Sequence, residues 1–234
     1  MKRTILLTAF IAIIFVTSGF TVKSPIEETR KLDDFSKVSF GISGTLYINI
    51  GPEFKVVLEG DKDDLEDIIT EVSGDKLIIK KERNWGMNMN EKVMVYITMP
   101  ELKSLGVSGS GKAEIRDAVK TTDLSFSVSG SGKLYPGNIE AENLNCSISG
   151  SGDIILDHSG NVGNAEIAIS GSGNYSGESL EINNADISIS GSGNCTCNVK
   201  EDLHARVSGS GDVYYVGDPK IDARVSGSGK IRSK

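Results

Sequence analysis

The chain has 234 residues, of which 38% are hydrophobic and 24% charged, with 27 glycines and a formal net charge of −7. This length and hydrophobic content allow one domain, or two small ones, with a buried core, and they exclude a disordered chain. The acidic balance, without a cluster of Lys and Arg, argues against a nucleic-acid partner. Three cysteines cannot form a disulfide scaffold, and two histidines leave little for a metal site or a His-dependent triad.

The first 20 residues have the layout of an export signal. Lys2 and Arg3 form a positive start, residues 5–16 are apolar, and small residues follow at 17–19. The apolar run is too short for a stable transmembrane helix, which favours a signal peptide over the alternative of an uncleaved anchor. Because no second apolar span follows, we expect a mature chain without a transmembrane segment, exported to the periplasm, the cell surface or the medium.

Residues 30–105 are more charged and less regular than the rest of the chain. We expect them to form an N-terminal β-rich cap or lobe that covers one end of the following domain, because an open sheet edge invites pairing. Ser43 and Gly44 resemble a degenerate corner. A short helix is predicted within residues 61–72, with Asp61 favoured at its start. Strands are predicted at residues 37–42, 45–50, 54–58, 76–81 and 92–98.

The tetrapeptide Ser-Gly-Ser-Gly occurs seven times from residue 108 onward, at steps of 18 to 21 residues. A period near 20 is typical of a solenoid. A flexible linker, the alternative for any single copy, does not explain the patterned flanks. The copies start at Ser108, Ser129, Ser149, Ser170, Ser190, Ser208 and Ser226.

The flanks of each copy alternate between apolar and polar residues. Apolar residues precede the motif by one, three and five positions, which predicts a strand with one buried face. After the motif a polar residue and then a mostly apolar one predict a second strand. Two or three short strands per repeat predict an all-β fold, a right-handed parallel β-helix over residues 106–234. The predicted core includes Val107, Val128, Ile148, Ile169, Ile189, Val207 and Val225, and two residues before each of these Leu105, Phe126, Cys146, Ile167, Ile187, Ala205 and Ala223.

The motif itself is predicted to form the corner of each coil, where glycine allows a sharp bend and close approach of neighbouring coils. Stacking then places like residues over one another. The polar residue after each corner forms a predicted ladder, with ion pairs between Lys133 and Asp153 and between Asp212 and Lys230, and amide pairing of Asn174 with Asn194. The ladder comprises Lys112, Lys133, Asp153, Asn174, Asn194, Asp212 and Lys230.

The motif pattern [Val/Ile]-Ser-Gly-Ser-Gly-[Asp/Asn/Lys], after an export signal, resembles the head GIN domain family of bacterial envelope proteins, described as auto-transporter adhesins. Residues 35–42, residues 56–79 and the run from Pro100 to Val107 also fit that family's opening. The resemblance covers about residues 30–234. It implies a β-helical fold, an envelope location and no enzyme activity, and it brings no catalytic or binding residues with it.

Few side chains indicate a catalytic or metal-binding role. Cys146, Cys195 and Cys197 are predicted to face the core as free thiols. Asp157 and His158 form the only neighbouring acid–His pair, whereas a carbohydrate-active enzyme needs clustered carboxylates. No cofactor or metal site is therefore predicted.

The favoured function is a non-enzymatic binding scaffold or adhesin of the cell envelope. Its partner would be a glycan, a surface polymer or an envelope protein. The alternatives are a β-helical carbohydrate-active enzyme and a self-associating structural module. The candidate contact residues are Trp85, Met87 and Met89, which are adaptable apolar residues in a polar segment, together with Lys112 and Lys133.

Overall fold

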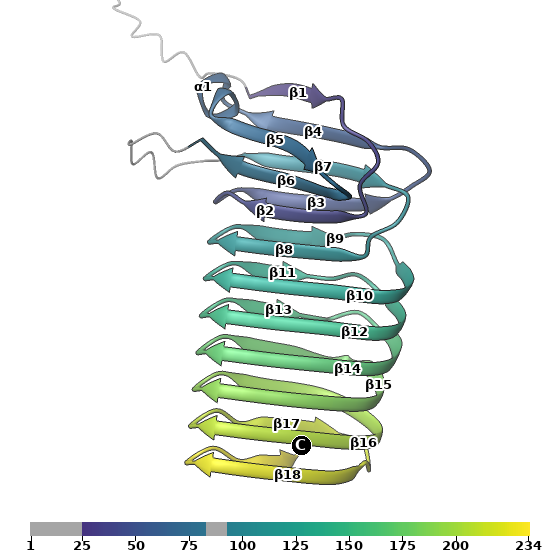
Figure 1. The fold of residues 1–234 in the computed structure, drawn as a ribbon, viewed down its shortest axis with the longest axis vertical. Helices are drawn as coiled ribbons and strands as arrows, with labels where there is room; N and C mark the ends of the chain where they lie inside the picture. Colours follow the sequence, from purple (N-terminus) through teal and green to yellow (C-terminus); the bar gives the residue numbers. More distant parts are fainter. Residues whose placement is uncertain (1–24, 83–92) are drawn as a thin grey trace, which may run out of the picture.

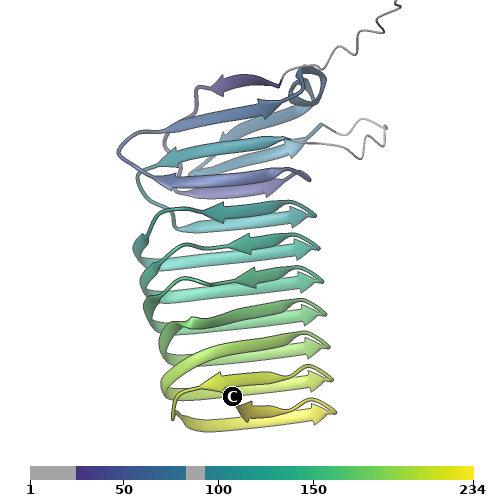
Figure 2. The ribbon, with the colours of Figure 1, turned by 180° about the vertical axis from the view of Figure 1, so that it is seen from behind.

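The computed structural model describes residues 25–82 and 93–234. Within them the chain winds into a β-helix, a stack of coils in which each coil pairs with the next (Figure 1). Each coil contributes a strand to both sides of a flattened rod, and the view from behind shows the second side (Figure 2). We call the side whose strands lead into the repeated motif the motif face, and the other side the return face. The predicted all-β solenoid is confirmed.

The motif face runs along the whole rod. From β8 to β18 its strands are parallel and in phase, so that Ser129 lies between Ser108 and Ser149. In spatial order its strands are β5 (Ile68–Ser73), β6 (Lys76–Lys81), β2 (Lys37–Gly41), β8 (Ser104–Gly109), β10 (Val119–Gly130), β12 (Ile139–Gly150), β14 (Gly160–Gly171), the second parts of β15 (Asn174–Gly191) and β16 (Asn194–Gly209), and β18 (Lys220–Gly227).

The return face is built from shorter strands that follow the corners. Both β15 and β16 begin on it and then bend onto the motif face. Its other strands are β1 (Ile26–Arg30), β4 (Lys55–Gly60), β7 (Met94–Met99), β3 (Thr45–Ile50), β9 (Lys112–Ile115), β11 (Lys133–Tyr135), β13 (Asp153–Ile155), β17 (Val213–Val216) and β19 (Ile231–Ser233).

The core lies between the two faces as one continuous cluster. The alternation predicted from the repeat is confirmed from β8 to β16, where the inward rows are buried. In the last coil the predicted burial of the inward residues is wrong, since Val225 and Ile221 are 44% and 43% exposed. These residues keep their inward register opposite Val207 and Leu203, but within residues 25–82 and 93–234 no strand pairs on their other side.

The N-terminal end is built differently, because three strand pairs there are antiparallel. β4 pairs with β7 and β1 pairs with β4 on the return face, while β5 pairs with β6 on the motif face. The helix α1 (Lys62–Glu66) lies at this end of the rod and buries Leu65 (Figure 1). The short helix predicted within residues 61–72 is confirmed, with Asp61 at its N-cap. It ends at Glu66, because the β-branched residues that follow pair as β5.

The strands and the corner predicted for this segment are confirmed. Strands form at all five predicted places, with bounds shifted by at most two residues. Ser43 and Gly44 turn the chain between β2 and β3 in the way that the motif turns it between β8 and β9. Because β2 and β3 pair with β8 and β9, strand pairing continues across residue 105.

The two glycines of each motif meet different requirements. The first has a positive φ in every copy, from 87° at Gly109 to 132° at Gly209, which side-chain-bearing residues avoid. The second leaves no room for a side chain, because a Cβ at Gly193 would overlap the Gly173 carbonyl oxygen of the preceding coil. The corner backbone bonds to the preceding coil: the N–H of Ser131 donates to the Gly109 carbonyl at 2.8 Å, and equivalent bonds recur in each later copy.

The polar ladder forms after the corners as predicted. Lys133 Nζ donates to Asp153 at 2.8 Å, Asn174 Nδ2 donates to Asp153 at 3.0 Å, and Asn194 Nδ2 donates to Asn174 at 3.0 Å. Each of these bonds connects two coils that are already paired through the backbone. The ladder therefore stabilises the corner edge of the stack.

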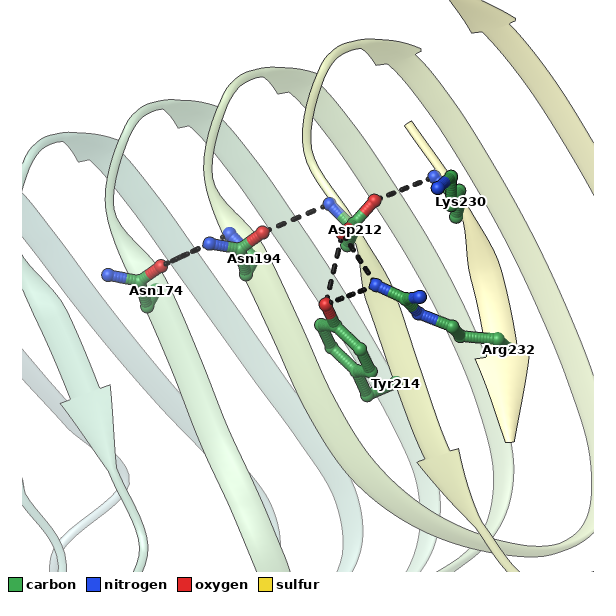
Figure 3. A network of polar contacts seen from close by, with 6 residues as sticks. All are labelled: Asn174, Asn194, Asp212, Tyr214, Lys230 and Arg232. Atoms are coloured by element: carbon green, nitrogen blue, oxygen red, sulfur yellow. Dashed lines mark hydrogen bonds and ion pairs between the residues drawn. The ribbon is translucent and has the colours of Figure 1, made fainter. Parts of the chain in front are cut away.

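The predicted ion pair between the side chains of Asp212 and Lys230 is wrong, because Lys230 contacts Asp212 through its backbone (Figure 3). Lys230 donates its backbone N–H to Asp212 Oδ1 at 2.8 Å, and the cation beside Asp212 is Arg232, at 3.3 Å from Oδ2. Tyr214 completes the group, since its hydroxyl donates to Asp212 at 3.0 Å and accepts from Arg232 at 2.7 Å.

These contacts lower the pKa of two carboxyl groups. Burial raises the pKa of Asp153, but the hydrogen bonds from Lys133 and Asn174 outweigh burial and hold it below its ordinary value. The Tyr214 hydrogen bond is the largest cause of the lowered pKa of Asp212, and Lys230 and Arg232 add to it against partial burial. Both groups therefore favour the folded state when ionised.

The three cysteines are buried and free, as predicted. Cys146 lies on the motif face, whereas Cys195 and Cys197 lie on the return face, where Cys195 pairs with Tyr175. Burial raises the pKa of the Cys146 thiol, which keeps it protonated. These thiols act as small apolar side chains of the core.

Replacing Gly191 with Ala should destabilise the protein more than replacing Gly109, which has the same place in the motif. An Ala at Gly109 meets nothing within 4 Å and pays only for its positive φ, about 1 kcal/mol. At Gly191 the Cβ would also overlap the Gly171 carbonyl oxygen, which should cost about 1–3 kcal/mol more. Urea unfolding of both variants measures the difference, and equal losses would contradict the close packing of coils.

The protein should be less stable at acidic pH, because two carboxylates of the corner ladder become protonated. Asp153 and Asp212 have a lower pKa in the folded chain than in the unfolded chain. Their contribution to the free energy of unfolding is therefore complete above the unfolded pKa of about 3.9, and it is lost as the pH falls through their folded pKa values. The double variant Asp153→Asn, Asp212→Asn should therefore be less stable at neutral pH and change less between neutral and acidic pH. Urea unfolding at both pH values tests this, with Asp218→Asn, in a turn outside the ladder, as control. An unchanged acid dependence in the double variant would refute it.

Candidate functional site

An open groove of about 1400 Å³ runs along the motif face. It begins beside Lys37 and Lys76, near the N-terminal end, and reaches His204 and Arg206 on β16. Its floor consists of the outward-facing residues of β10, β12, β14, β15 and β16, which stack in rows because those strands pair in register. The groove is thus a direct consequence of the repeat.

The first row is a second amide ladder. Asn143 Nδ2 donates to Asp123 at 2.9 Å, Asn164 Nδ2 donates to Asn143 at 3.2 Å, and Asn184 Nδ2 donates to Asn164 at 3.2 Å. All donors point toward the N-terminal end of the rod, and the series ends on the Asp123 carboxylate. Each inner amide keeps its other N–H and oxygen lone pair for a ligand.

A bend in each strand positions this row. Pairing between β10, β12, β14 and β15 omits one residue per strand at Thr122, Glu142, Gly163 and Asn183. The alternation of inward and outward side chains is interrupted there, so that Thr122 and the following Asp123 are both exposed. The groove follows this bend, with Thr121 and Thr122 among its lining residues.

The second row lies two residues further along each strand and carries more charge. Asn145 Nδ2 donates to Glu166 at 3.4 Å. Asp186 pairs in register with Glu166, and its carboxylate lies 3.6 Å from the Arg206 guanidinium. The row continues with the exposed His204, whose Nδ1 lies 3.6 Å from Asp222. This row therefore places two neighbouring carboxylates, Glu166 and Asp186, between the Asn145 amide and the His204 imidazole.

The charges of the groove balance. Four cationic side chains line it, Lys37, Lys76, Lys103 and Arg206, and four acidic ones, Glu101, Asp123, Glu166 and Asp186. Several form local pairs, such as Lys103 with Glu101 at 3.1 Å. The groove therefore has no strong field of either sign, and it suits a polar ligand of low net charge.

The predicted contact residues lie elsewhere. Trp85, Met87 and Met89 fall outside the described residues. Lys112 and Lys133 are neighbours in register on the corner ladder, beyond the lining of the groove. Their charges are engaged, since Lys112 lies 3.3 Å from Glu114 and Lys133 lies 2.8 Å from Asp153. The structure therefore leaves no unpaired cation at these two positions.

The acid–His pair also lies away from the groove. Asp157 and His158 line a smaller cavity of about 250 Å³, together with Tyr135 and Arg116. Among residues 25–82 and 93–234, no group of three or more His, Cys, Asp or Glu side chains is placed to hold a metal ion. In the same residues no helix has the length and apolar character that a membrane crossing needs.

The groove was not predicted from the sequence, because the predictions rested on the inward-facing residues and the corner motif. The signal was present at the sixth position before five of the seven motifs, which holds Asp123, Asn143, Asn164, Asn184 and Asp202. A strand position that repeatedly carries Asn, a residue of low β-propensity, indicates a role for the side chain. What the sequence did not supply was the bend that opens this row to solvent.

Comparison with known proteins agrees with this architecture. The family model described as "Putative auto-transporter adhesin, head GIN domain" matches residues 34–219. A crystal structure of a "putative adhesin" from Bacteroides fragilis has a TM-score of 0.83 at 25% identity, covering 91% of this chain and 98% of that one. No curated protein is significantly similar to this chain.

Two structures from Parabacteroides distasonis share the fold. One is described as a "putative lipid binding protein", with a TM-score of 0.70 at 25% identity over 90% of this chain and 97% of that one. The other is a "putative adhesin", with a TM-score of 0.72 at 18% identity over 91% and 98%. Because the family model matches most of the chain, including the coils that form the groove, this protein belongs to the head GIN domain family, described as "Putative auto-transporter adhesin".

Proposed function

We propose that the protein is a non-enzymatic binding scaffold of the cell envelope, which holds an extended polar polymer along the motif-face groove. A glycan is the favoured ligand class. The observation that carries this proposal is the groove itself, about 1400 Å³ of space lined by amides, hydroxyls and balanced charges over successive coils. The adhesin description of the family supports a role in surface binding.

The periodicity of the groove suits a polymer. Neighbouring coils lie about 4.8 Å apart, so that each row offers the same kind of contact at a regular step. Asn143, Asn164 and Asn184 each present an amide that can donate and accept at once, which matches the hydroxyl groups of a sugar. Many weak contacts in register would then add along one extended ligand.

The lining argues for a sugar rather than a lipid chain. An acyl chain needs a wide apolar surface, whereas this groove exposes Asn, Ser, Thr and charged residues. The apolar side chains of these strands point inward and fill the core. The lipid-binding description of one relative therefore has no matching surface in this groove.

The alternative of a carbohydrate-active enzyme would use the same groove. Glu166 and Asp186 are neighbours in register, and paired carboxylates serve glycoside hydrolysis. Each is engaged by a neighbour, Glu166 by Asn145 and Asp186 by Arg206, which suits fixed polar contacts for binding. Incubation with each bound glycan, followed by analysis of its chain length, decides between the two; cleavage that Glu166→Gln abolishes would replace the scaffold proposal.

Removing a groove pair should weaken glycan binding. The variant Asn145→Ala, Glu166→Ala deletes both members of a hydrogen-bonded pair and leaves neither unpaired. Since each lost contact costs about 0.5–1.5 kcal/mol, its affinity for a glycan selected from a panel should fall roughly tenfold. Isothermal titration calorimetry measures this loss.

The matched control is Ser176→Ala, Thr196→Ala, which changes two neighbours in register on the return face. It should bind as the wild type does. Equal losses in both double variants, or the absence of binding to every neutral, zwitterionic and anionic glycan tested, would contradict the proposal.

The proposed envelope location has its own test. If the export signal is used, a C-terminally tagged chain should be absent from the cytosolic fraction. Protease treatment of intact and of lysed cells then separates the surface from the periplasm. Recovery of the intact chain, with its first residues retained, in the cytosol would contradict the location.

A further inference from the structure

The last coil leaves an unpaired strand edge at the C-terminal end of the rod. Among the described residues β18 pairs only with β16, and all eight of its residues are exposed (Figure 1). Its inward residues Ile221, Ala223 and Val225 remain uncovered. The opposite end of the rod is built from antiparallel strand pairs and α1, which buries Leu65, so the two ends are not equivalent.

We propose that this edge is a docking surface for a second copy of the same chain, and that two rods join end to end through antiparallel pairing of β18 with its counterpart. This interaction does not depend on the groove function. It would close both open edges at once, because in a twofold-symmetric contact each copy covers the other.

The sequence of β18 is complementary to itself when two copies run antiparallel about Ala223. In that register Asp222 of one copy faces Arg224 of the other, and Ile221 faces Val225. Both charge pairs are then attractive, and the apolar residues meet on the inward side. A shift by one residue would instead place Asp222 opposite Ala223, and each apolar side chain would then face a charged one.

The backbone points the right way for this pairing. At the fourth residue before the motif, the N–H is directed to the preceding coil, since Ser125 donates to the Lys103 carbonyl at 2.9 Å. Asp222 holds the equivalent place in β18. Strand alternation therefore directs the N–H and C=O groups of Ile221, Ala223 and Val225 to the open edge, where facing residues exchange both hydrogen bonds.

The same alternation brings the charged side chains close. Asp222 and Arg224 would form non-hydrogen-bonded pairs, in which opposite Cα atoms lie about 4.5 Å apart and side chains interact most directly. Arg224 has no acidic partner within the described part of its own chain. It stands in register beside Arg206, which is itself paired with Asp186. An aspartate from a second copy would supply the missing countercharge.

Charge reversal tests the proposal on the purified full-length protein. Sedimentation velocity over a wide range of concentrations should show a monomer–dimer equilibrium for the wild type. Asp222→Arg places Arg opposite Arg, and Arg224→Asp places Asp opposite Asp, so each variant alone should weaken dimerisation by about tenfold or more. Both substitutions lie on exposed positions, and circular dichroism verifies their folding.

Recombination of the charges provides the decisive control. The double variant Asp222→Arg, Arg224→Asp should dimerise again, and an equimolar mixture of the two single variants should form the heterodimer, in which both pairs are attractive. A wild type that stays monomeric at every concentration, dimers that ignore both single variants, or growth into open-ended polymers would each overturn the proposal. Loss of glycan binding with dimerisation unchanged would affect only the groove.

Discussion

Parallel backbone pairing between like positions of successive coils is the constraint on which the whole structure depends. A single coil has two narrow strands and cannot bury its own apolar residues, so its core exists only when neighbours stack above and below it. Stacking in register requires each coil to turn at the same place. The Ser-Gly-Ser-Gly corner meets that need, since one glycine takes a positive φ and the other gives the carbonyl of the preceding coil room to approach.

The same register converts a linear repeat into rows of side chains. At the corner the row of Asn and Asp stabilises the stack, because each amide or carboxylate is bonded to the coils on either side. On the motif face a similar row of Asn lies along a bend and borders an open groove. The difference between a structural ladder and a candidate binding surface thus lies in the backbone curvature and not in the residue type.

The ends of the rod show what happens where pairing stops. At the N-terminal end the chain folds back, and antiparallel strands with one short helix cover the outermost coil and bury Leu65. At the other end the last coil has the same inward apolar residues as those before it, but they are exposed. An edge of this kind offers unpaired backbone groups and apolar surface together, which is the combination that favours association.

The sequence by itself determined the solenoid, the corner, the buried rows from Val107 to Val207 and the contacts of Lys133 with Asp153 and Asn174 with Asn194. These follow from a period of about 20 residues and an alternation of two, which are local properties that stacking merely repeats. Only the tertiary structure decided that residues 68–73 pair as a strand, that Arg232 and not the Lys230 side chain neutralises Asp212, and that Val225 is exposed. It alone also revealed the groove, because the bend is visible only in the pairing of successive coils, which skips Thr122, Glu142 and Gly163. Contacts within the repeat are set by position in the sequence, whereas contacts at its bends and ends depend on which neighbour is present in space.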